Sequence, residues 1–241
     1  MLRTLYLLYF FIIALPLFLV ITILSSTIAI LGCLLGGQAY FSYYPGKVWS
    51  ILSLMLFLMP VEIKGREHLR NVTLPAMVMA NHQSSLDIFL MYGYLGIPFR
   101  WVMKASLRKI PFIGKACEAS GFIFVDDTKR LSIEQTIRDG KNVLASGNSI
   151  FIFPEGHRTR TGEMARFKKG GFIMSYELSK PIIPISIHGA FEALPIHKKI
   201  PTPRRLTLTI HPAIEIDKEQ PFPIAINDSI RAVSQSIASA L

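Results

Sequence analysis

Cysteine and charge are both scarce in parts of this sequence, and each scarcity excludes a class of protein. Cys33 and Cys117 are the only two cysteines in 241 residues. One falls in an apolar run and the other in the polar part, so neither a disulfide framework nor a zinc site is indicated. No charged residue occurs between Arg3 and Lys47, and no acidic residue precedes Glu62. The chain therefore divides into an uncharged N-terminal part and a charged remainder.

The uncharged part predicts a membrane anchor. Residues 5–35 form a nearly unbroken apolar run, longer than the ~20 residues of one bilayer-spanning helix but too short for two full spans. Two geometries fit: one long tilted helix, or a helical hairpin within one leaflet that bends at Pro16 or at residues 32–37. We expect the hairpin, because Arg3 and Lys47 place positive charge on both flanks, which is compatible with two cytoplasmic ends.

Aromatic side chains follow the apolar run and indicate a membrane interface. Tyr40, Phe41, Tyr43, Tyr44 and Trp49 suit an interface belt, and residues 48–59 are too short to span but right for lying in that interface. A cleaved signal peptide is the alternative, but its apolar region usually runs only about 7 to 15 residues. We therefore expect residues 1–60 to be the anchor, made of the hairpin and the interfacial segment, and residues 61–241 to form a separate folded domain.

The second part of the chain is strongly basic. Residues 61–241 hold all but two of the 26 Lys and Arg and all 16 acidic residues, an excess of eight positive charges. On a domain tethered to lipid, this excess indicates an anionic partner: phospholipid headgroups, a phosphate-bearing substrate or an acidic carrier. Nucleic acid is not expected, because no helix-turn-helix, zinc finger or aromatic RNA-binding signature is present.

Strand and helix patterns alternate along this basic part. Continuous apolar runs predict buried strands at 76–80, 99–103, 121–125, 149–153 and 182–187, followed by an alternating strand at 205–210. Helical periods or helix signals lie at 84–91, 106–114 (broken by Pro111), 128–146, 170–178 and 227–241. The alternation predicts an α/β domain with a mostly parallel or mixed sheet flanked by helices.

A histidine and an aspartate mark the end of the first buried strand. His82 would lie in the strand-to-helix turn, where open α/β sheets bind ligands. Asp87, five positions later, could orient the imidazole as a general base. The same stretch also fits a plain helix start, with Ser84 as N-cap and Asp87 as its capping partner. The spacing alone leaves both interpretations open.

A second polar cluster follows the strand at 149–153. Its basic side chains are Arg158, Arg160, Arg166, Lys168 and Lys169. Guanidinium groups and backbone amides in such a glycine-bearing loop can hold a dianionic phosphate, and a basic face toward anionic lipid is the alternative. Glu155 could shape the loop through a salt bridge or accept a hydrogen bond from a substrate hydroxyl. The spacing is not that of a nucleotide P-loop.

Taken in order, these motifs resemble the glycerolipid acyltransferase family over about residues 63–187. The family's His-x4-Asp block stands at His82 and Asp87. A later block stands at residues 153–158, Phe-Pro-Glu-Gly-His-Arg, in which the family usually has Glu-Gly-Thr-Arg, and residues 167–171 follow it. A proline-rich strand matches residues 180–187. Order and spacing make the combination specific, although each block alone is weak.

One block departs from the family pattern. Its Lys-x2-Leu-x6-Gly part is intact as Lys104, Leu107 and Gly114. Asp127 stands where the family has an arginine, and Arg130 lies three residues further on. Arg130 is therefore the expected substitute, and acceptor recognition is the property that this change would affect.

The resemblance implies transfer of a fatty acyl group from coenzyme A or acyl carrier protein to the sn-2 hydroxyl of lysophosphatidic acid. The product would be phosphatidic acid for phospholipid biosynthesis, made on the cytoplasmic face of a bacterial inner membrane. His82 would be the general base and Asp87 its orienting partner. No metal or other cofactor is implied, because an activated alcohol attacks a thioester without one.

The resemblance also implies a phosphate site. Lys104, Arg158 and Arg130 would hold the acceptor phosphate, with Glu155 and Gly156 shaping that site. Three other functions stay open at this point. They are an acyltransferase for another acceptor, such as a lyso-ornithine lipid or glycerol 3-phosphate; a lipid hydrolase, disfavoured by the missing Gly-x-Ser-x-Gly elbow; and a non-enzymatic membrane-surface binding protein.

Overall fold

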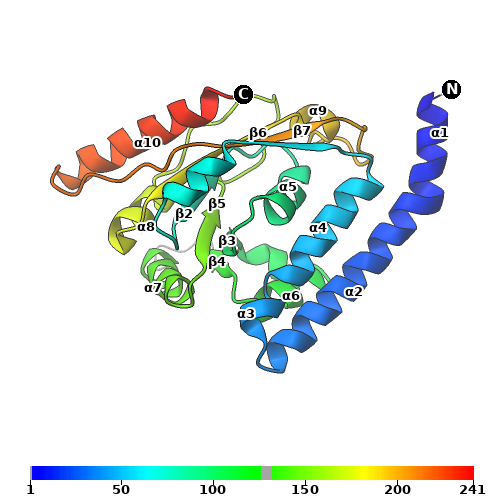
Figure 1. Ribbon diagram of the computed structural model, residues 1–241, viewed down its shortest axis with the longest axis horizontal. Helices are drawn as coiled ribbons and strands as arrows, with labels where there is room; N and C mark the ends of the chain where they lie inside the picture. The colour runs from blue at the N-terminus through cyan, green and yellow to red at the C-terminus, as the bar shows by residue number, and fades with distance from the viewer. Residues whose placement is uncertain (1, 126–131) are drawn as a thin grey trace.

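A seven-stranded sheet forms the centre of the computed structural model, which describes residues 2–125 and 132–241 (Figure 1). The strands are β1 Val61–Lys64, β2 Met77–Ala80, β3 Phe99–Lys104, β4 Ile123–Val125, β5 Ser149–Ile152, β6 Ile182–His188 and β7 Leu206–Ile210. Their order across the sheet is β1-β7-β6-β2-β5-β3-β4. Only the β6–β7 pairing is antiparallel among the described strands, so the mostly parallel, mixed sheet expected from the sequence is confirmed.

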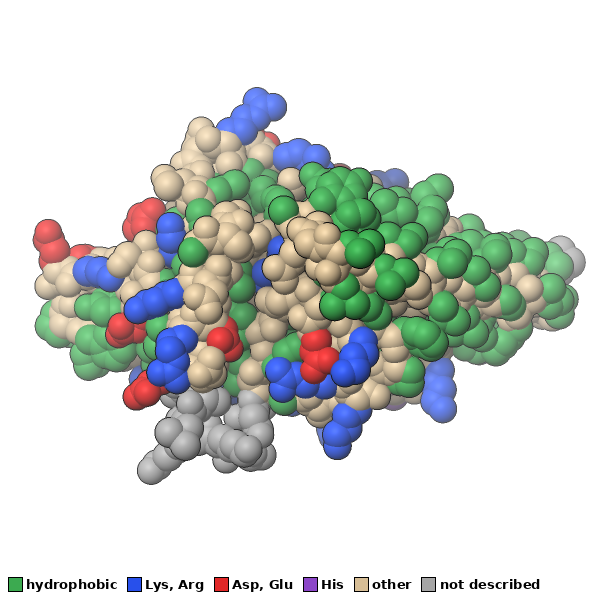
Figure 2. Space-filling view, turned by 90° about the horizontal axis from the view of Figure 1, so that it is seen from below, with side chains coloured by type: hydrophobic (Ala, Val, Ile, Leu, Met, Phe, Trp, Pro, Cys, Tyr) green, Lys and Arg blue, Asp and Glu red, His purple; other side chains and the backbone are tan. Residues whose placement is uncertain are grey.

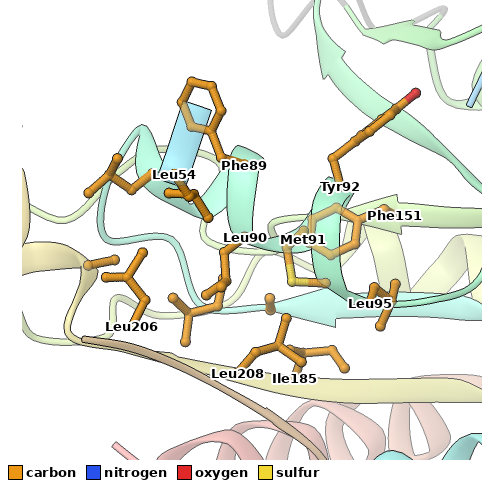
Figure 3. Close-up of a cluster of buried hydrophobic side chains, with 14 of the residues drawn as sticks. Leu54, Phe89, Leu90, Met91, Tyr92, Leu95, Phe151, Ile185, Leu206 and Leu208 are labelled. Atoms are coloured by element: carbon orange, nitrogen blue, oxygen red, sulfur yellow. The ribbon is translucent and has the colours of Figure 1, made fainter. Parts of the chain in front are cut away.

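Helices cover both faces of the sheet. They are α5 Leu86–Tyr94, α6 Ile113–Ala119, α7 Ser132–Ala145, α8 Gly170–Leu178, α9 Ala190–Ala193 and α10 Phe222–Ala238, with 3-10 turns at Arg66–Asn71 and Ala105–Lys109. On one face α5 packs Leu90 and Met91 toward Ile185 and Leu208 of the sheet (Figure 3). On the other face α7, α8 and α10 bury a second cluster around Phe172. These strands can be apolar throughout because both of their faces are covered.

The N-terminal part begins with one long helix, and the chain turns back only after that helix ends. Helix α1 (Leu2–Tyr9), a π-helical turn (Phe10–Ala14) and α2 (Leu15–Leu34) follow one another without a break. The bend considered at Pro16 is therefore wrong. Pro16 has no N–H to donate to a carbonyl of the preceding turn, and the wider π turn just before it accommodates the proline ring and that missing bond.

The chain reverses at residues 35–37, within the glycine-rich stretch. A Cβ on Gly32 would lie 2.1 Å from the Phe41 ring, so only glycine allows this close return. Helices α3 (Gln38–Phe41) and α4 (Tyr44–Leu56) follow, and α4 runs back along α2 (Figure 1). The N-terminal helix is 33 residues long and contains an 18-residue stretch with a mean hydropathy of 2.9, so it is long and apolar enough to cross a membrane.

Helix α4 joins this long helix to the domain. It lies between α2 and α5, and Ser50, Ser53 and Leu54 are fully buried on its inner side. Phe10 and Ala14 of the long helix belong to the same buried cluster as the sheet residues. The hydrophobic core thus continues across residue 60, and the division into an anchor and a domain there stays a prediction.

The sequence placed two helices incorrectly. Residues 106–114, expected to be helical, hold the 3-10 turn Ala105–Lys109 and only the start of α6, which begins at Ile113. Helix α10 begins at Phe222 and not at Asn227. Pro221 precedes it and Pro223 lies in its first turn, where a proline costs nothing because the first backbone N–H groups have no partner within the helix. The polar capping residues at 227 and 228 drew the predicted start one turn too late.

We expect Leu90→Ala to lower the free energy of unfolding by about 2–5 kcal/mol, because it opens a cavity in a fully buried cluster. Denaturant unfolding followed by circular dichroism in detergent measures this. The matched control is Ile224→Ala on α10, where the side chain is 51% exposed and a change of under about 0.5 kcal/mol is expected. Equal effects of the two substitutions would contradict the packing described here.

Candidate active site

The predicted site residues gather where the direction of the chain crossovers changes. Strands β2 and β5 are parallel neighbours in the sheet. The helix after β2, α5, packs on one face, whereas the helix after β5, α8, packs on the opposite face. Between two such strands the connections separate and leave a crevice at the carboxyl ends, where open α/β sheets bind their ligands. His82 follows β2 and the basic loop follows β5.

Asp87 holds the imidazole of His82 and the start of α5 with one oxygen. His82 Nδ1 lies 2.8 Å from Asp87 Oδ2, and the backbone N–H groups of Gln83 and Ser84 donate to the same oxygen at 2.6 and 2.8 Å. The carboxyl group is fully buried. The capping and the imidazole-orienting interpretations therefore both hold, with the helix beginning after Ser85 and not after Ser84.

This bond fixes the tautomer of His82. A carboxylate can only accept, so Nδ1 carries the proton and Nε2 is left as an acceptor. The ring is also held from its face, because it stacks on Phe153 with the ring centres 3.8 Å apart and the planes 8° from parallel. The imidazole is thus fixed in both position and plane, with 15% of its side chain exposed.

Glu155 joins the turn after β2 to the loop after β5. Its Oε1 accepts the backbone N–H of His82 at 2.6 Å, and Oε2 accepts that of Ala165 at 2.7 Å. Burial raises the pKa of this carboxyl, and the two amide donors oppose that rise. A third hydrogen bond joins the same two segments: the Thr159 N–H, in the loop after β5, donates to the His82 carbonyl at 2.9 Å. The geometry favours a loop-shaping role for Glu155 over contact with a substrate hydroxyl.

Arg158 lies beside the histidine turn. Its Nη1 donates to the Oγ of Ser85, one residue before α5. Gly156 has a φ of +77°, and a Cβ there would approach Lys168 Nζ to 2.7 Å. A side chain at 156 would strain the backbone and displace Lys168 from the same cavity wall.

A cavity of about 760 Å³ lies at this edge of the sheet. Its polar wall includes His82, Lys104, Gly156, Arg158 and Lys168. The rest of its wall is mostly apolar and comes from α2, α4, α5, α6, the strands β3 and β5, and the side chains of Leu107 and Ile110. Such a cavity suits an amphiphilic anion, with its charged group at the polar wall and a hydrocarbon chain in the apolar part.

The structure thus brings four of the seven predicted site residues to the cavity wall. Asp87 and Glu155 stand behind that wall and hold His82 and the loop in place. Arg130, with the departing Asp127, lies outside the described residues, so its predicted role stays a prediction.

Sequence reasoning missed several contributors. Gly170 and Gly171, in the first turn of α8, line the cavity, so the partly positive end of a helix faces it. Phe153 and Ser85 were also missed, although both lie inside the matching motifs. A sequence gives no signal for these two roles. Phe153 stacks on the His82 ring and Ser85 accepts a hydrogen bond from Arg158, and both contacts join segments that are distant in the sequence.

Fold and site together define an open α/β protein in which a histidine held by a buried aspartate lies beside several cations at the crevice of the sheet. The chain belongs to the Acyltransferase family, whose sequence profile matches residues 60–188. That range contains every predicted site residue from His82 to Arg158.

Individual relatives agree with this assignment. A 1-acyl-sn-glycerol-3-phosphate acyltransferase of Chlamydomonas reinhardtii is 30% identical over 200 residues, which is 83% of this chain and 58% of that protein. One from Pseudomonas aeruginosa is 30% identical over 180 residues, 73% of this chain and 68% of that protein. A chloroplastic relative from Arabidopsis thaliana is 31% identical over 64% of this chain and 43% of its own length. The chain thus spans about half the length of several curated relatives it matches.

A solved structure shows the same fold over nearly the whole chain. The crystal structure of the 1-acyl-sn-glycerophosphate acyltransferase of Thermotoga maritima superposes with a TM-score of 0.76 at 22% identity. The match covers 98% of this chain and 96% of that one, so it includes the N-terminal helices as well as the sheet.

We expect Glu155→Gln to destabilise the fold by about 1–3 kcal/mol. A carboxamide can accept only one of the two backbone N–H groups and turns its own donor toward the other, leaving a buried donor unpaired. Thermal or denaturant unfolding would measure the loss. Glu163→Gln, at an exposed position in the same loop, is the matched control and should change little. An unaltered stability of Glu155→Gln would rule out the joining role.

Proposed function

We propose that the protein transfers a fatty acyl group from a thioester to the sn-2 hydroxyl of lysophosphatidic acid, giving phosphatidic acid for phospholipid biosynthesis. One observation carries the proposal: His82, held from behind by Asp87, and several cations line the polar wall of a cavity whose remainder is mostly apolar. The matched relatives from Chlamydomonas, Pseudomonas and Thermotoga support it, because all three are named as acyltransferases for this acceptor.

His82 is the proposed general base. Its Nε2 takes the proton of the acceptor hydroxyl while the hydroxyl oxygen attacks the thioester carbon, forming the new C–O bond. The tetrahedral intermediate then breaks its C–S bond, and the departing thiolate takes the proton from the imidazolium. Asp87 keeps the proton on Nδ1 throughout and stabilises the imidazolium through the 2.8 Å contact.

The cationic wall is the proposed phosphate site. Lys104 at the end of β3 and Arg158 after β5 reach one cavity wall from two strands, and we assign Arg130 as a third contact. Gly156 lets Lys168 approach that wall. The intermediate's oxyanion also needs donors, and the first-turn amides of α8 at Gly170 and Gly171 line the same cavity. Glu155 would act only by shaping the loop.

The apolar surfaces complete the proposal. The acyl chain would occupy the part of the cavity lined by α2, α4 and α6. The helix Leu2–Leu34, with α4 returning along it, would form a hairpin anchor held in one leaflet, and residues 61–241 would work on the cytoplasmic face of a bacterial inner membrane. The donor would be acyl-CoA or acyl carrier protein, and the basic domain surface would attract anionic phospholipids.

A second acceptor class is supported by one residue. Asp127 replaces the arginine of the resembled family, and a carboxylate is unsuited to a phosphate. An acyltransferase for another acceptor is therefore the runner-up, with the same base chemistry. Asp127 favours a lyso-ornithine lipid, which has no phosphate, whereas glycerol 3-phosphate keeps the phosphate and differs from lysophosphatidic acid in lacking the acyl chain.

For the base, we expect His82→Ala to lower kcat by about 10²–10⁴-fold, because general acid–base catalysis contributes that much. Acyl transfer is measured with lysophosphatidic acid and a panel of acyl thioesters, and folding is checked by circular dichroism. The exposed His197→Ala serves as control and should keep full activity. Substantial residual turnover in His82→Ala would remove the histidine from this role and favour a membrane-binding protein without catalysis.

For the phosphate site, Arg158→Ala should raise the KM for lysophosphatidic acid by about 10- to 100-fold, the value of a hydrogen bond to a charged group. The KM for the acyl donor should stay the same. Ser85→Ala, which only frees the guanidinium, should give a smaller rise. If the acceptor KM is unchanged in Arg158→Ala, the phosphate binds elsewhere.

A further inference from the structure

In addition to the apolar surface of the N-terminal helix, a second apolar surface lies at the start of α6. We call residues 107–112 the entry loop. Leu107, Ile110 and Phe112 are 37%, 39% and 50% exposed in this short stretch. Large apolar side chains gathered so closely on a surface indicate a contact with another apolar phase or partner.

The backbone of the entry loop holds Phe112 outward. Phe112 has a φ of +60°, an unfavourable conformation for a bulky residue. The N–H of Gly114 donates to the Ile110 carbonyl at 2.8 Å, and that of Ala116 to the Phe112 carbonyl at 2.9 Å. A Cβ on Gly114 would lie 2.1 Å from the Arg108 carbonyl oxygen, so the tight turn requires this glycine. The exposure of the phenyl ring is thus built into the turn.

Positive charge borders these apolar side chains. Arg108, Lys109 and Lys115 are all exposed, and Glu118 contacts Arg108 at 3.2 Å and Lys115 at 3.3 Å. Three cations against one carboxylate leave the border positive. Apolar side chains ringed by Lys and Arg fit the interface of an anionic bilayer, and a purely apolar protein partner would not use the cations.

The entry loop is also next to the N-terminal helix. Helix α6 packs on α2, and Gln38 Nε2 donates to the Ala119 carbonyl at 3.1 Å. At that end Leu34, the last residue of the long helix, and Leu35 in the following turn are 74% and 88% exposed. Figure 2 shows hydrophobic side chains gathered over the half of the molecule that carries the N-terminal helix, with Lys and Arg at the border.

We propose that the entry loop inserts into the bilayer interface as a second membrane contact, beside the N-terminal helix. Leu107 and Ile110 line the cavity together with Ser25, Ala29 and Trp49 of α2 and α4. The cavity therefore lies between two apolar structures that contact the same lipid. A lysolipid then passes from the bilayer into the cavity without exposing its chain to water, a consequence that rests on the proposed function.

Lipid contact is tested by a tryptophan in place of the exposed ring. Phe112→Trp should add fluorescence that brominated phosphatidylglycerol vesicles quench at least twofold more than they quench the parent protein's emission. The matched control, Ile224→Trp on α10, replaces a side chain that is 51% exposed and should show no added quenching. Equal quenching at the two positions, or none at 112, overturns the proposal whatever reaction the protein catalyses.

A kinetic comparison tests the consequence for substrate entry. Phe112→Asn keeps the positive φ tolerable, because asparagine adopts it more readily. It should raise the KM at least fivefold for lysophosphatidic acid carried in anionic vesicles and leave the KM for a short-chain, monomeric lysolipid unchanged. Equal changes for the two presentations contradict entry through the loop. A parent protein inactive on both overturns the proposed function, while the quenching result still decides the membrane contact.

Discussion

The buried carboxyl of Asp87 is the constraint on which the rest of the site depends. One oxygen accepts from the His82 ring and from two backbone N–H groups, so the same atom stabilises the start of α5 and fixes the tautomer of His82. A fully buried carboxylate is costly unless donors surround it, and here the donors are the chain turn that must also carry the imidazole. The hydrogen bonds that stabilise the start of α5 therefore also fix the position of the imidazole.

The position of this turn at the crevice of the sheet brings it next to the basic loop that follows β5. Strands β2 and β5 are neighbours whose following helices pack on opposite faces, so their loops meet at one edge. Glu155 fixes that meeting by accepting one backbone amide from each loop. Arg158 then reaches Ser85 across the crevice. Residues some seventy positions apart become one polar wall because a single buried carboxylate holds both segments.

Much of this could be predicted from the sequence, and the remainder has physical reasons. Buried parallel strands are continuous apolar runs, so the strand at Met77–Ala80 and the turn carrying His82 were visible. The cavity was not, because its apolar wall combines side chains of α2, α4, α5, α6 and β3 with Leu107 and Ile110, and only packing brings these segments together. The sequence leaves two roles open for Glu155, because a carboxylate that accepts two backbone N–H groups has the same sequence pattern as one that pairs with arginine. Pro16 predicted a possible bend that a π turn absorbs.

The central claim is that Asp87 leaves His82 with an unprotonated Nε2 facing the cavity. Nitrogen-15 NMR of the ring of His82 at a pH where the imidazole is neutral tests it most directly, with the resonance assigned by its loss in His82→Ala. The account predicts a proton on Nδ1 and a bare Nε2. A ring that carries its proton on Nε2 would contradict it, because no base would then face the acceptor hydroxyl.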